Sequence, residues 1–150
     1  MPTTPLVPHD FAVPAGLSND LFVIEPLDVR HNESDHAAWT SSIDHIKATP
    51  GFAGRSWPEP MSLTENAADL ARHARDLTDR TGLAYTVLDP GSGEVIGCVY
   101  IYPPRRDGYD VDVRSWVRAD RADLDKPLHD VVRRWLAEAW PFRRPDYAER

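Results

Sequence analysis

A chain of 150 residues with 41% apolar and 27% charged residues has the length and composition of one ordinary folded domain, which excludes a wholly disordered protein. The formal net charge of −7 argues against general nucleic-acid binding, because such binding depends on a basic face that neutralises phosphates. Apolar runs of only a few residues argue against a membrane span, and the single cysteine, Cys98, cannot form an internal disulfide, so we expect a cytoplasmic protein with a buried Cys98.

The start of the chain differs in character from the rest. Prolines at positions 2, 5, 8 and 14 interrupt a stretch without helical or strand periodicity, so we predict an extended, proline-rich arm over residues 1–20. This arm can pack on the body or on a second subunit. Residues 21–150 carry the periodic patterns of a single folded domain.

The first predicted elements of that domain are a strand and a helix. The stretch LFVIEPLDV, from residue 21, has strand composition, and its proline favours an edge or a bulge. A helix is expected to begin at residues 32–35, because Trp39, Ile43 and Ile46 recur on one face at helical spacing. It ends before the proline and glycine that open the loop GFAGRSWPEP.

A second helix follows this loop. Ser62 and Glu65 form a capping-box pattern, in which two side chains bond reciprocally to the backbone of the first turn. Gly82 ends the helical pattern. The apolar stripe of this helix consists of Leu63, Ala67, Leu70, Ala74 and Leu77.

Three strand-like runs come next, LAYTVLD, EVIGCVYIY and YDVDVRSWV, joined by the turn sequences DPGSG and PPRRDG. Such short connections predict an antiparallel meander. In the third run, one face carries valines that pack on helices. The other face carries Asp110 and Asp112 and is expected to be partly solvated or to line a cleft.

A long final helix is predicted from a set of apolar residues at helical spacing, and the following PFRRPDYAER has room for one short strand. The residues of this helical stripe are Leu128, Val131, Val132, Trp135, Leu136 and Ala139.

The order of these elements resembles the GNAT superfamily over residues 21–148. The matching stretches are LFVIEPL, EVIGCVYIYP, YDVDVRSWVR and RADRADLDKPLHDVVRRWL. GNAT proteins are N-acetyltransferases that move an acetyl group from acetyl-CoA to an amine. The resemblance implies an α+β fold with a central, mostly antiparallel twisted sheet, helices on both faces and, here, shortened C-terminal elements. It also implies acetyl-CoA as co-substrate and a small-molecule or peptide amine as acceptor.

In the family, the turn before the last of these helices reads Arg or Gln, two residues, Gly, one residue, then Gly or Ala. Here Arg121 takes the first position, and Leu124 and Lys126 stand where the glycines would be. Glycine lets backbone N–H groups approach a diphosphate at the helix N-terminus. The cofactor-binding residues implied by the resemblance are Trp116, Val117, Arg118, Arg121, Lys126 and Leu128.

The same turn also has an alternative interpretation. Asp123 or Asp125 can cap the helix and accept the N–H groups that a phosphate would otherwise take. Three cations and three anions between residues 118 and 126 cancel, so the turn offers little net attraction to a highly negative cofactor.

The catalytic candidates are two carboxylates. An acetyltransferase must take a proton from the ammonium of its substrate, and Asp110 and Asp112, on the non-core face of the strand before the turn, can do so. The alternative is that both aspartates are merely solvated. The resemblance further implies a tyrosine on a later helix that protonates the leaving thiolate. This sequence has no such helix, and Tyr147 would replace that tyrosine only by coincidence.

Other polar residues fit ordinary structural roles. His31, Asp35 and His36 make a poor zinc set, so no metal is expected. His45 and His73 fit helix-surface positions.

Two arginine pairs, Arg105 with Arg106 and Arg143 with Arg144, are expected to be solvated, although either pair can meet an anion.

Two hypotheses follow from the sequence. The first is a GNAT-type N-acetyltransferase in which Asp112, or a water it orders, is the base. The second is a catalytically inactive GNAT-like binding or interaction module that has lost the usual CoA site. A homodimer is expected in either case, because the shortened sheet leaves an edge that a neighbour's arm can cover.

Overall fold

Six strands form one sheet at the centre of the computed structural model, which describes residues 5–150; positions 1–4 of the predicted arm lie outside the described residues. The strands follow one another across the sheet in chain order. Each neighbouring pair is antiparallel except β5 and β6, which run parallel. The strands are β1 (Leu17–Ser18), β2 (Val23–Pro26), β3 (Leu83–Leu88), β4 (Val95–Tyr102), β5 (Val111–Val117) and β6 (Pro145–Tyr147).

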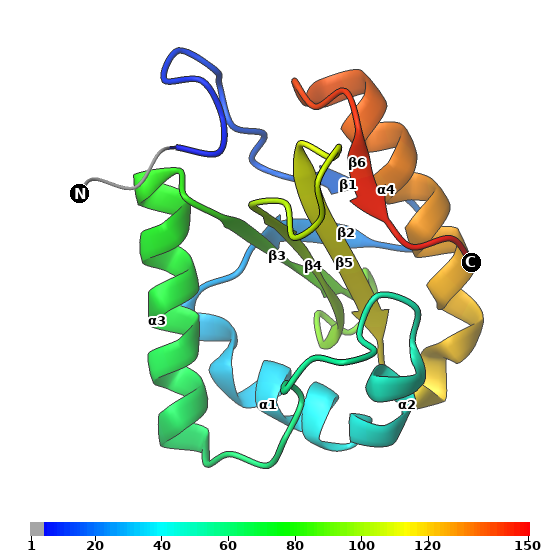
Figure 1. Ribbon diagram of the computed structural model, residues 1–150. Helices are drawn as coiled ribbons and strands as arrows, with labels where there is room; N and C mark the ends of the chain where they lie inside the picture. Colours follow the sequence, from blue (N-terminus) through cyan, green and yellow to red (C-terminus); the bar gives the residue numbers. More distant parts are fainter. Residues whose placement is uncertain (1–4) are drawn as a thin grey trace.

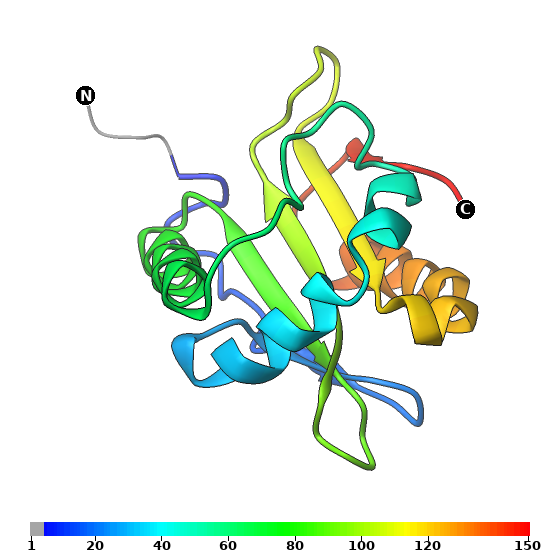
Figure 2. The same ribbon diagram turned by 90° about the horizontal axis from the view of Figure 1, so that it is seen from below.

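Helices cover both faces of the twisted sheet (Figure 1). Helices α1, α2 and α3 lie on one face and α4 lies on the other, as the view from below in Figure 2 shows. The predicted α+β fold, with its mostly antiparallel sheet and helices on both faces, is therefore confirmed. The helical segments are η1 (Val29–His31), α1 (Asn32–Thr40), α2 (Ile43–Ala48), α3 (Leu63–Asp79), η2 (Ala119–Leu124) and α4 (Asp125–Ala139).

The single helix predicted from residue 32 to residue 49 is divided into α1 and α2 by two serines. Ser41 Oγ donates to the carbonyl of Ala38 at 2.9 Å, and Ser42 leaves the helical region at φ −132° and ψ 18°. Serine side chains that bond to nearby backbone groups compete with helix continuation in this way. The break turns the hydroxyl of buried Ser42 toward the chain after β5, where it accepts the N–H of Ala119 at 2.8 Å.

Helix α3 begins as predicted and ends earlier. Ser62 Oγ accepts the N–H of Glu65, and the Glu65 carboxylate accepts the N–H of Ser62, which completes the capping box. The helix stops at Asp79 because Arg80 adopts a left-handed conformation with φ 61°. Gly82 is needed for another reason, since a Cβ at that position would lie 2.1 Å from the ring of Tyr102.

The buried face of α3 is more polar than the predicted stripe. Leu70 is buried, but Leu63 is 42% exposed, and the other buried residues of the helix are Asn66 and His73. The surface position predicted for His73 is therefore wrong. Its ring packs beside Tyr102 of β4, and the Tyr102 hydroxyl lies 2.6 Å from Nδ1.

The second core layer lies between the sheet and α4. Leu128, Val132 and Trp135 of α4 are buried in it, as the helical spacing predicted. Val7 joins the same core with 2% exposure, and β1 pairs with β2, so the described part of the arm packs on its own chain. It covers the edge of β2, at the opposite end of the sheet from β6. The homodimer stays a prediction.

Cys98 lies in the core on the opposite face, under α1. It has no exposed surface, and burial raises the pKa of its thiol, so the thiol stays protonated. The expected burial of this residue is confirmed. In the part of the chain from residue 5 onward, no helix is both long and apolar enough to cross a membrane.

Gly97 sits at an irregularity of β4 where the backbones of β4 and β5 come close together. Val87 pairs with Gly97 and Leu88 pairs with Val95, so one residue of β4 bulges between them. A Cβ on Gly97 would lie 2.4 Å from the carbonyl oxygen of Trp116, which is a backbone atom that cannot rotate away. Glycine therefore fixes the end of β5 just before the chain turns into α4.

We expect Gly97→Ala to lower the free energy of unfolding by about 1–3 kcal/mol, because the added methyl group must push β4 and β5 apart. The matched control is Gly91→Ala, in an exposed turn, where the added Cβ meets one side-chain oxygen of Asp89 at 3.2 Å and no backbone atom of the described residues. This control is expected to change stability by at most about 0.5 kcal/mol. Urea denaturation followed by circular dichroism measures both values, and equal stabilities for the two variants would contradict the close approach.

Candidate functional site

The candidate site begins where β5 and β6 separate. The two parallel strands pair from Val111 with Pro145 to Val113 with Tyr147, and the pairing stops there. Residues 114–117 of β5 extend beyond it, while the chain after β6 turns toward α4 (Figure 1). We call this space the β5–β6 gap. It leaves one backbone edge of β5 without a neighbouring strand, directly before the turn into α4.

The side chain of Arg150 fills the β5–β6 gap. Its Nε donates to Oδ2 of Asp125 at 2.6 Å, and its Nη2 donates to the carbonyl of Ser115 at 3.0 Å. The Arg150 side chain is 4% exposed. Because Asp125 opens α4 and Ser115 lies on the free edge of β5, one guanidinium connects the helix start to the strand.

Tyr147 borders the gap from β6. Its hydroxyl lies 2.5 Å from Ser115 Oγ, and its ring packs against His129 of α4 with a centroid distance of 4.3 Å. Burial raises the pKa of Tyr147 to about 12, although the bond to Ser115 and the charge of Arg150 act in the opposite direction. Tyr147 therefore keeps its proton at neutral pH.

The turn from β5 into α4 uses several of its own amides. The N–H of Ala119 donates to Ser42 Oγ, and the N–H of Arg121 donates to the carbonyl of Arg118 at 2.9 Å. The N–H of Asp125 donates to Ala122 within the same 3-10 segment. No residue from 118 to 126 has a positive φ, so the missing glycines cost no backbone strain. Side chains in place of hydrogen atoms still limit how closely an anion can approach.

The predicted capping of α4 by Asp123 or Asp125 is wrong. The cap position is Leu124, with φ −90° and ψ −5°, and no side chain caps it. The 3-10 segment η2 runs straight into α4, so the helix does not start from the extended backbone that a capping aspartate requires. Asp125 lies in the first helical turn and binds Arg150 instead.

Two predicted cofactor-binding arginines are already engaged in ion pairs. Arg118 donates from Nε to Asp120 at 2.9 Å and lies 3.5 Å from Glu94. Arg121 donates to Asp89 at 2.9 Å. Arg121 and the amides of the turn after β3 hold the pKa of Asp89 at about 2. Both arginines would have to exchange these carboxylates for a phosphate.

The other predicted cofactor-binding residues fall into two groups. Lys126 is 69% exposed and pairs with Asp130 one helical turn away, which is a weak surface interaction. Trp116, Val117 and Leu128 have no exposed surface, so none of the three is open to a ligand in this structure. Lys126 is therefore the most available cation of the predicted set.

The two predicted catalytic aspartates have different environments. Asp110 is exposed, and its carboxylate accepts the amides of Arg143 and Arg144 at 2.6 and 3.0 Å, so it fixes the chain entering β6. Asp112 is 5% exposed and accepts two hydrogen bonds from Arg55 at 3.1 and 3.2 Å. The alternative in which both aspartates are solvated holds for the exposed Asp110 and not for the buried Asp112.

Asp112 faces a hollow of about 410 Å³ on the side of the sheet that carries α1 and α2. We call it the arginine hollow. Residues of the loop after α2, the β4–β5 hairpin, β5 and β6 line it. They are Gly51, Ala53, Arg55, Arg105, Arg106, Asp112, Val113, Arg114, Asp146 and Ala148.

A second polar hollow of about 220 Å³ meets the first at Arg114 and extends to α3. His73 lies on its wall. The Tyr102 hydroxyl that contacts His73 donates to Asp76 at 2.9 Å, and Asp69 lies 3.7 Å from the other ring nitrogen of His73. His73, Tyr102 and Asp76 therefore form a hydrogen-bonded chain, and Asp69 is a more distant ion-pair partner on the other side of the His73 ring.

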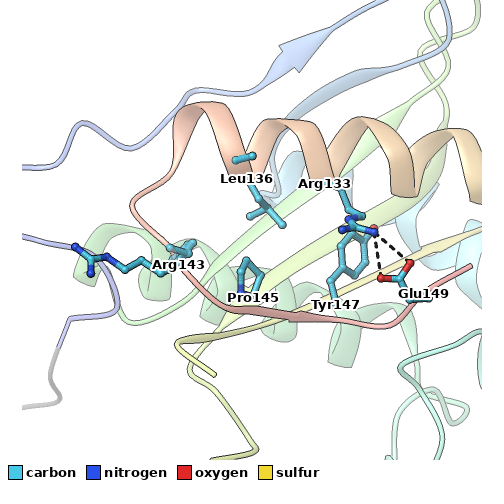
Figure 3. A pocket seen from close by; sticks show the side chains of 8 residues that line it. Arg133, Leu136, Arg143, Pro145, Tyr147 and Glu149 are labelled. Atoms are coloured by element: carbon cyan, nitrogen blue, oxygen red, sulfur yellow. Dashed lines mark hydrogen bonds and ion pairs between the residues drawn. The ribbon is translucent and has the colours of Figure 1, made fainter. Parts of the chain in front are cut away.

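A third hollow, of about 230 Å³, lies between α4 and β6 (Figure 3). Leu136 of α4 and Pro145 and Tyr147 of β6 give it an apolar floor. Arg133 and Glu149 form an ion pair at 3.1 Å beside it. Tyr147 separates this apolar hollow from Ser115 and the β5–β6 gap.

The three residues considered as zinc ligands, His31, Asp35 and His36, make hydrogen bonds within the fold. His31 bonds through its two ring nitrogens to the backbone N–H of Asp28 and to the carboxylate of Glu25. His36 bonds to the carbonyl of Met61, and the carboxylate of Asp35 accepts the side-chain amide of Asn66. Within residues 5–150, no cluster of three or more His, Cys, Asp or Glu side chains is arranged to hold a metal ion.

Sequence reasoning missed several residues of these sites. Nothing local in GRSWPEP indicates that Arg55 meets Asp112, and nothing near Arg150 indicates that it meets Asp125. His73 did carry a signal, because residues 66, 70, 73 and 77 follow helical spacing once polar side chains are allowed on the buried face.

The sequence matches no family model and no curated protein sequence. Several solved structures share the fold. A GCN5-related N-acetyltransferase from Brucella melitensis gives a TM-score of 0.64 at 18% identity, over 87% of this chain and 57% of its own. A ribosomal-protein-S5-alanine acetyltransferase from Vibrio fischeri gives 0.63 at 10% identity, over 84% and 69%. The microcin self-immunity acetyltransferase MccE, solved with acetyl-CoA and AMP, gives 0.57 at 11% identity, over 85% and 71%.

We expect Asp69 to contribute to stability in a pH-dependent way. His73 and Arg72 hold its pKa at about 2 against the opposing effect of burial. A carboxyl pKa that is lower in the folded state stabilises the fold above the unfolded value near 3.9, and this contribution fades as the pH falls toward 2. Asp69→Asn should therefore cost on the order of 1–2 kcal/mol at pH 6 and little at pH 2. Thermal unfolding across this range tests this, with exposed Asp79→Asn on the same helix as control; a constant cost would contradict it.

Proposed function

We propose that this chain, which has the GNAT fold, is an N-acetyltransferase that moves the acetyl group of acetyl-CoA to a small-molecule or peptide amine. The observation that supports this most is the β5–β6 gap beside the start of α4. The gap combines an unpaired strand edge with a helix N-terminus, and two hollows lie on the other side of β5.

The gap has the chemistry that an acyl-CoA arm requires. The arm is extended and contains amide groups, which can pair with a free strand edge as an added strand does. The carbonyl of Ser115, now bound by Arg150, is an acceptor on that edge. The N-terminal end of α4 carries the positive end of the helix dipole, which favours a diphosphate there, and Lys126 lies in the first turn.

The reaction requires two proton movements. The amine nitrogen attacks the thioester carbonyl after its ammonium loses a proton, and the C–S bond breaks to release a thiolate that takes up a proton. Asp112 is the better placed of the two predicted bases, because Asp110 is held by backbone amides away from the hollow. Since Arg55 occupies both Asp112 oxygens, we assign the base role to Asp112 acting through an ordered water.

Tyr147 is suited to the second proton transfer. Its hydroxyl borders the gap at Ser115 and stays protonated at neutral pH, so it can donate to the departing thiolate. Tyr147→Phe would keep the ring contact with His129 and remove only this donor.

The inactive-module hypothesis is favoured by one observation, the engagement of Arg150. A guanidinium that is 4% exposed and bound to Asp125 and Ser115 occupies the place of the acyl-CoA arm. In an active enzyme, Arg150 must leave the gap when acetyl-CoA enters. In a binding module, Arg150 stays, and the gap is a structural part of the fold.

Isothermal titration calorimetry with acetyl-CoA distinguishes these two functions. The enzyme predicts a dissociation constant below about 100 μM, and Arg121→Ala should weaken it several-fold because a diphosphate ligand loses one charge partner. Arg134→Ala removes the same charge from an exposed position of α4 and should leave the constant unchanged. Absence of heat at millimolar acetyl-CoA would sink the enzyme proposal and leave the binding module.

Arg150→Ala should tighten acetyl-CoA binding by about tenfold, which corresponds to about 1.4 kcal/mol, because the cofactor no longer has to break the bonds to Asp125 and Ser115. The same titration measures this. Arg133→Ala is the matched control, since it breaks the exposed pair with Glu149 outside the gap. Weaker binding in Arg150→Ala would show that Arg150 holds the ligand and does not compete with it.

A further inference from the structure

The arginine hollow carries an excess of positive charge in an acidic protein. Four arginines and two aspartates line it, which leaves a formal charge of +2, whereas the whole chain has a formal charge of −7. A concave site with one sign of charge concentrates ligands of the opposite sign. The cations are Arg55, Arg105, Arg106 and Arg114.

One of the four arginines is fully used by the protein itself. Arg106 donates from Nε and Nη2 to the two carboxylate oxygens of Asp146, at 2.8 and 2.7 Å. This two-bond geometry is the strong form of an arginine–carboxylate pair. The positive charge of the hollow therefore resides on the remaining three arginines, of which Arg55 and Arg114 share the single carboxylate of Asp112.

The guanidinium of Arg114 is held between aromatic rings and has N–H groups that make no hydrogen bond to any described residue. Its guanidinium stacks over the rings of Tyr100 and Phe52, at 4.9 and 5.4 Å from their centroids. Stacking occupies the faces of the guanidinium and leaves its in-plane N–H groups free to bond. The Nε atom is buried without a hydrogen bond and lies 3.5 Å from Oδ2 of Asp112.

Arg55 and Arg105 add to this excess. Arg55 donates from Nε to the carbonyl of Gly51 and from Nη2 to the carboxylate of Asp112. Burial lowers the pKa of Arg55, and the charges of Arg114 and Arg105 lower it further, while Asp112 acts in the opposite direction. Within residues 5–150, Arg105 makes no ion pair and no hydrogen bond through its side chain. Three cations therefore face one carboxylate in the hollow.

We propose that the arginine hollow binds an oxyanion, a carboxylate or a phosphate group, and that this group belongs to the acyl acceptor. The site suits such a group because Arg114 and Arg105 offer planar, fork-shaped donors that match the geometry of both anions. The volume of about 410 Å³ is that of a small-molecule site. The assignment to the acceptor rests on the proposed acetyltransferase function, whereas oxyanion binding itself does not.

The position of the hollow explains why the anion would belong to the acceptor. Arg114 is followed directly on β5 by Ser115, which borders the β5–β6 gap. Adjacent residues of a strand are about 3.3 Å apart along its axis and point to opposite faces, so an anion on Arg114 and a thioester in the gap lie on the two sides of one strand. The acceptor class is therefore an amine that carries an acidic group a few bonds away.

The first test is calorimetric titration of the full chain with inorganic phosphate and, separately, with acetate at constant ionic strength. Arg114→Ala should weaken binding about tenfold or more, and Arg105→Ala about fivefold. Arg105 is exposed, so its variant keeps the test valid if Arg114→Ala fails to fold. Asp112→Asn should strengthen binding, because it removes the carboxylate that competes with the ligand. Exposed Arg75→Ala on α3 is the control and should change nothing.

The response of the two anions identifies the group. Tighter binding of phosphate than of acetate assigns a phosphate, and the reverse order assigns a carboxylate. No heat from either anion at tens of millimolar, or equal binding in Arg105→Ala and Arg75→Ala, overturns the oxyanion site.

The second test uses three amines of similar length: propylamine, β-alanine and phosphoethanolamine. Binding is measured calorimetrically in the presence of CoA, which does not require turnover. At least one acidic amine should bind at least fivefold tighter than propylamine, and Arg105→Ala should remove that preference. Equal binding of all three overturns the acceptor assignment. Failure of acetyl-CoA to bind, with phosphate or acetate still bound in the hollow, overturns the transferase proposal alone.

Discussion

The structure depends on the early end of the pairing between strands β5 and β6. Parallel β5 and β6 share only the registers from Val111 to Val113, and the chain after β6 then leaves the sheet. Backbone groups at an open strand edge need partners, which is why exposed edges are covered or paired in folded proteins. Here a side chain supplies the partner, because Arg150 donates to the carbonyl of Ser115 and also neutralises Asp125. The same edge is what a ligand with extended amide groups would use.

Electrostatic pairing then decides what the site can bind. The cations near the turn, Arg118, Arg121 and Lys126, already pair with carboxylates. An anionic ligand therefore has to replace a carboxylate as the partner of one of these side chains. Exposed pairs are weak and can be exchanged at little cost, whereas the enclosed pair of Arg150 and Asp125 is harder to break. Under the proposed function, acyl-CoA has to displace this enclosed ion pair. The missing glycines cost no backbone strain, because no residue of the turn has a positive φ, although the side chains in their place limit how closely an anion can approach.

The sequence was sufficient for features set by local patterns and insufficient for contacts between distant segments. Alternation in β5, the box of Ser62 and Glu65, and the spacing of α4 all predicted their elements correctly. The break at Ser42 was not predictable, because it is tied to the amide of Ala119, far along the chain. The prediction that Asp123 or Asp125 caps α4 was wrong for a related reason. The segment η2 continues into α4 and places Leu124 at the cap position.

The alternation of β5 connects the proposed cofactor and acceptor positions. Ser115 points to the same face as Val113 and Val117, toward α4, while Arg114 points to the opposite face, toward Phe52 and Tyr100. In a continuous sheet these two faces would be separated by hydrogen-bonded strands. Because β6 does not cover residues 114–117, the side chain of Arg150, and no strand, lies between the two faces at the β5–β6 gap. Under the proposed function, a thioester lying in that gap is open to an amine held from the arginine hollow, and the early end of β6 is the structural condition for transfer.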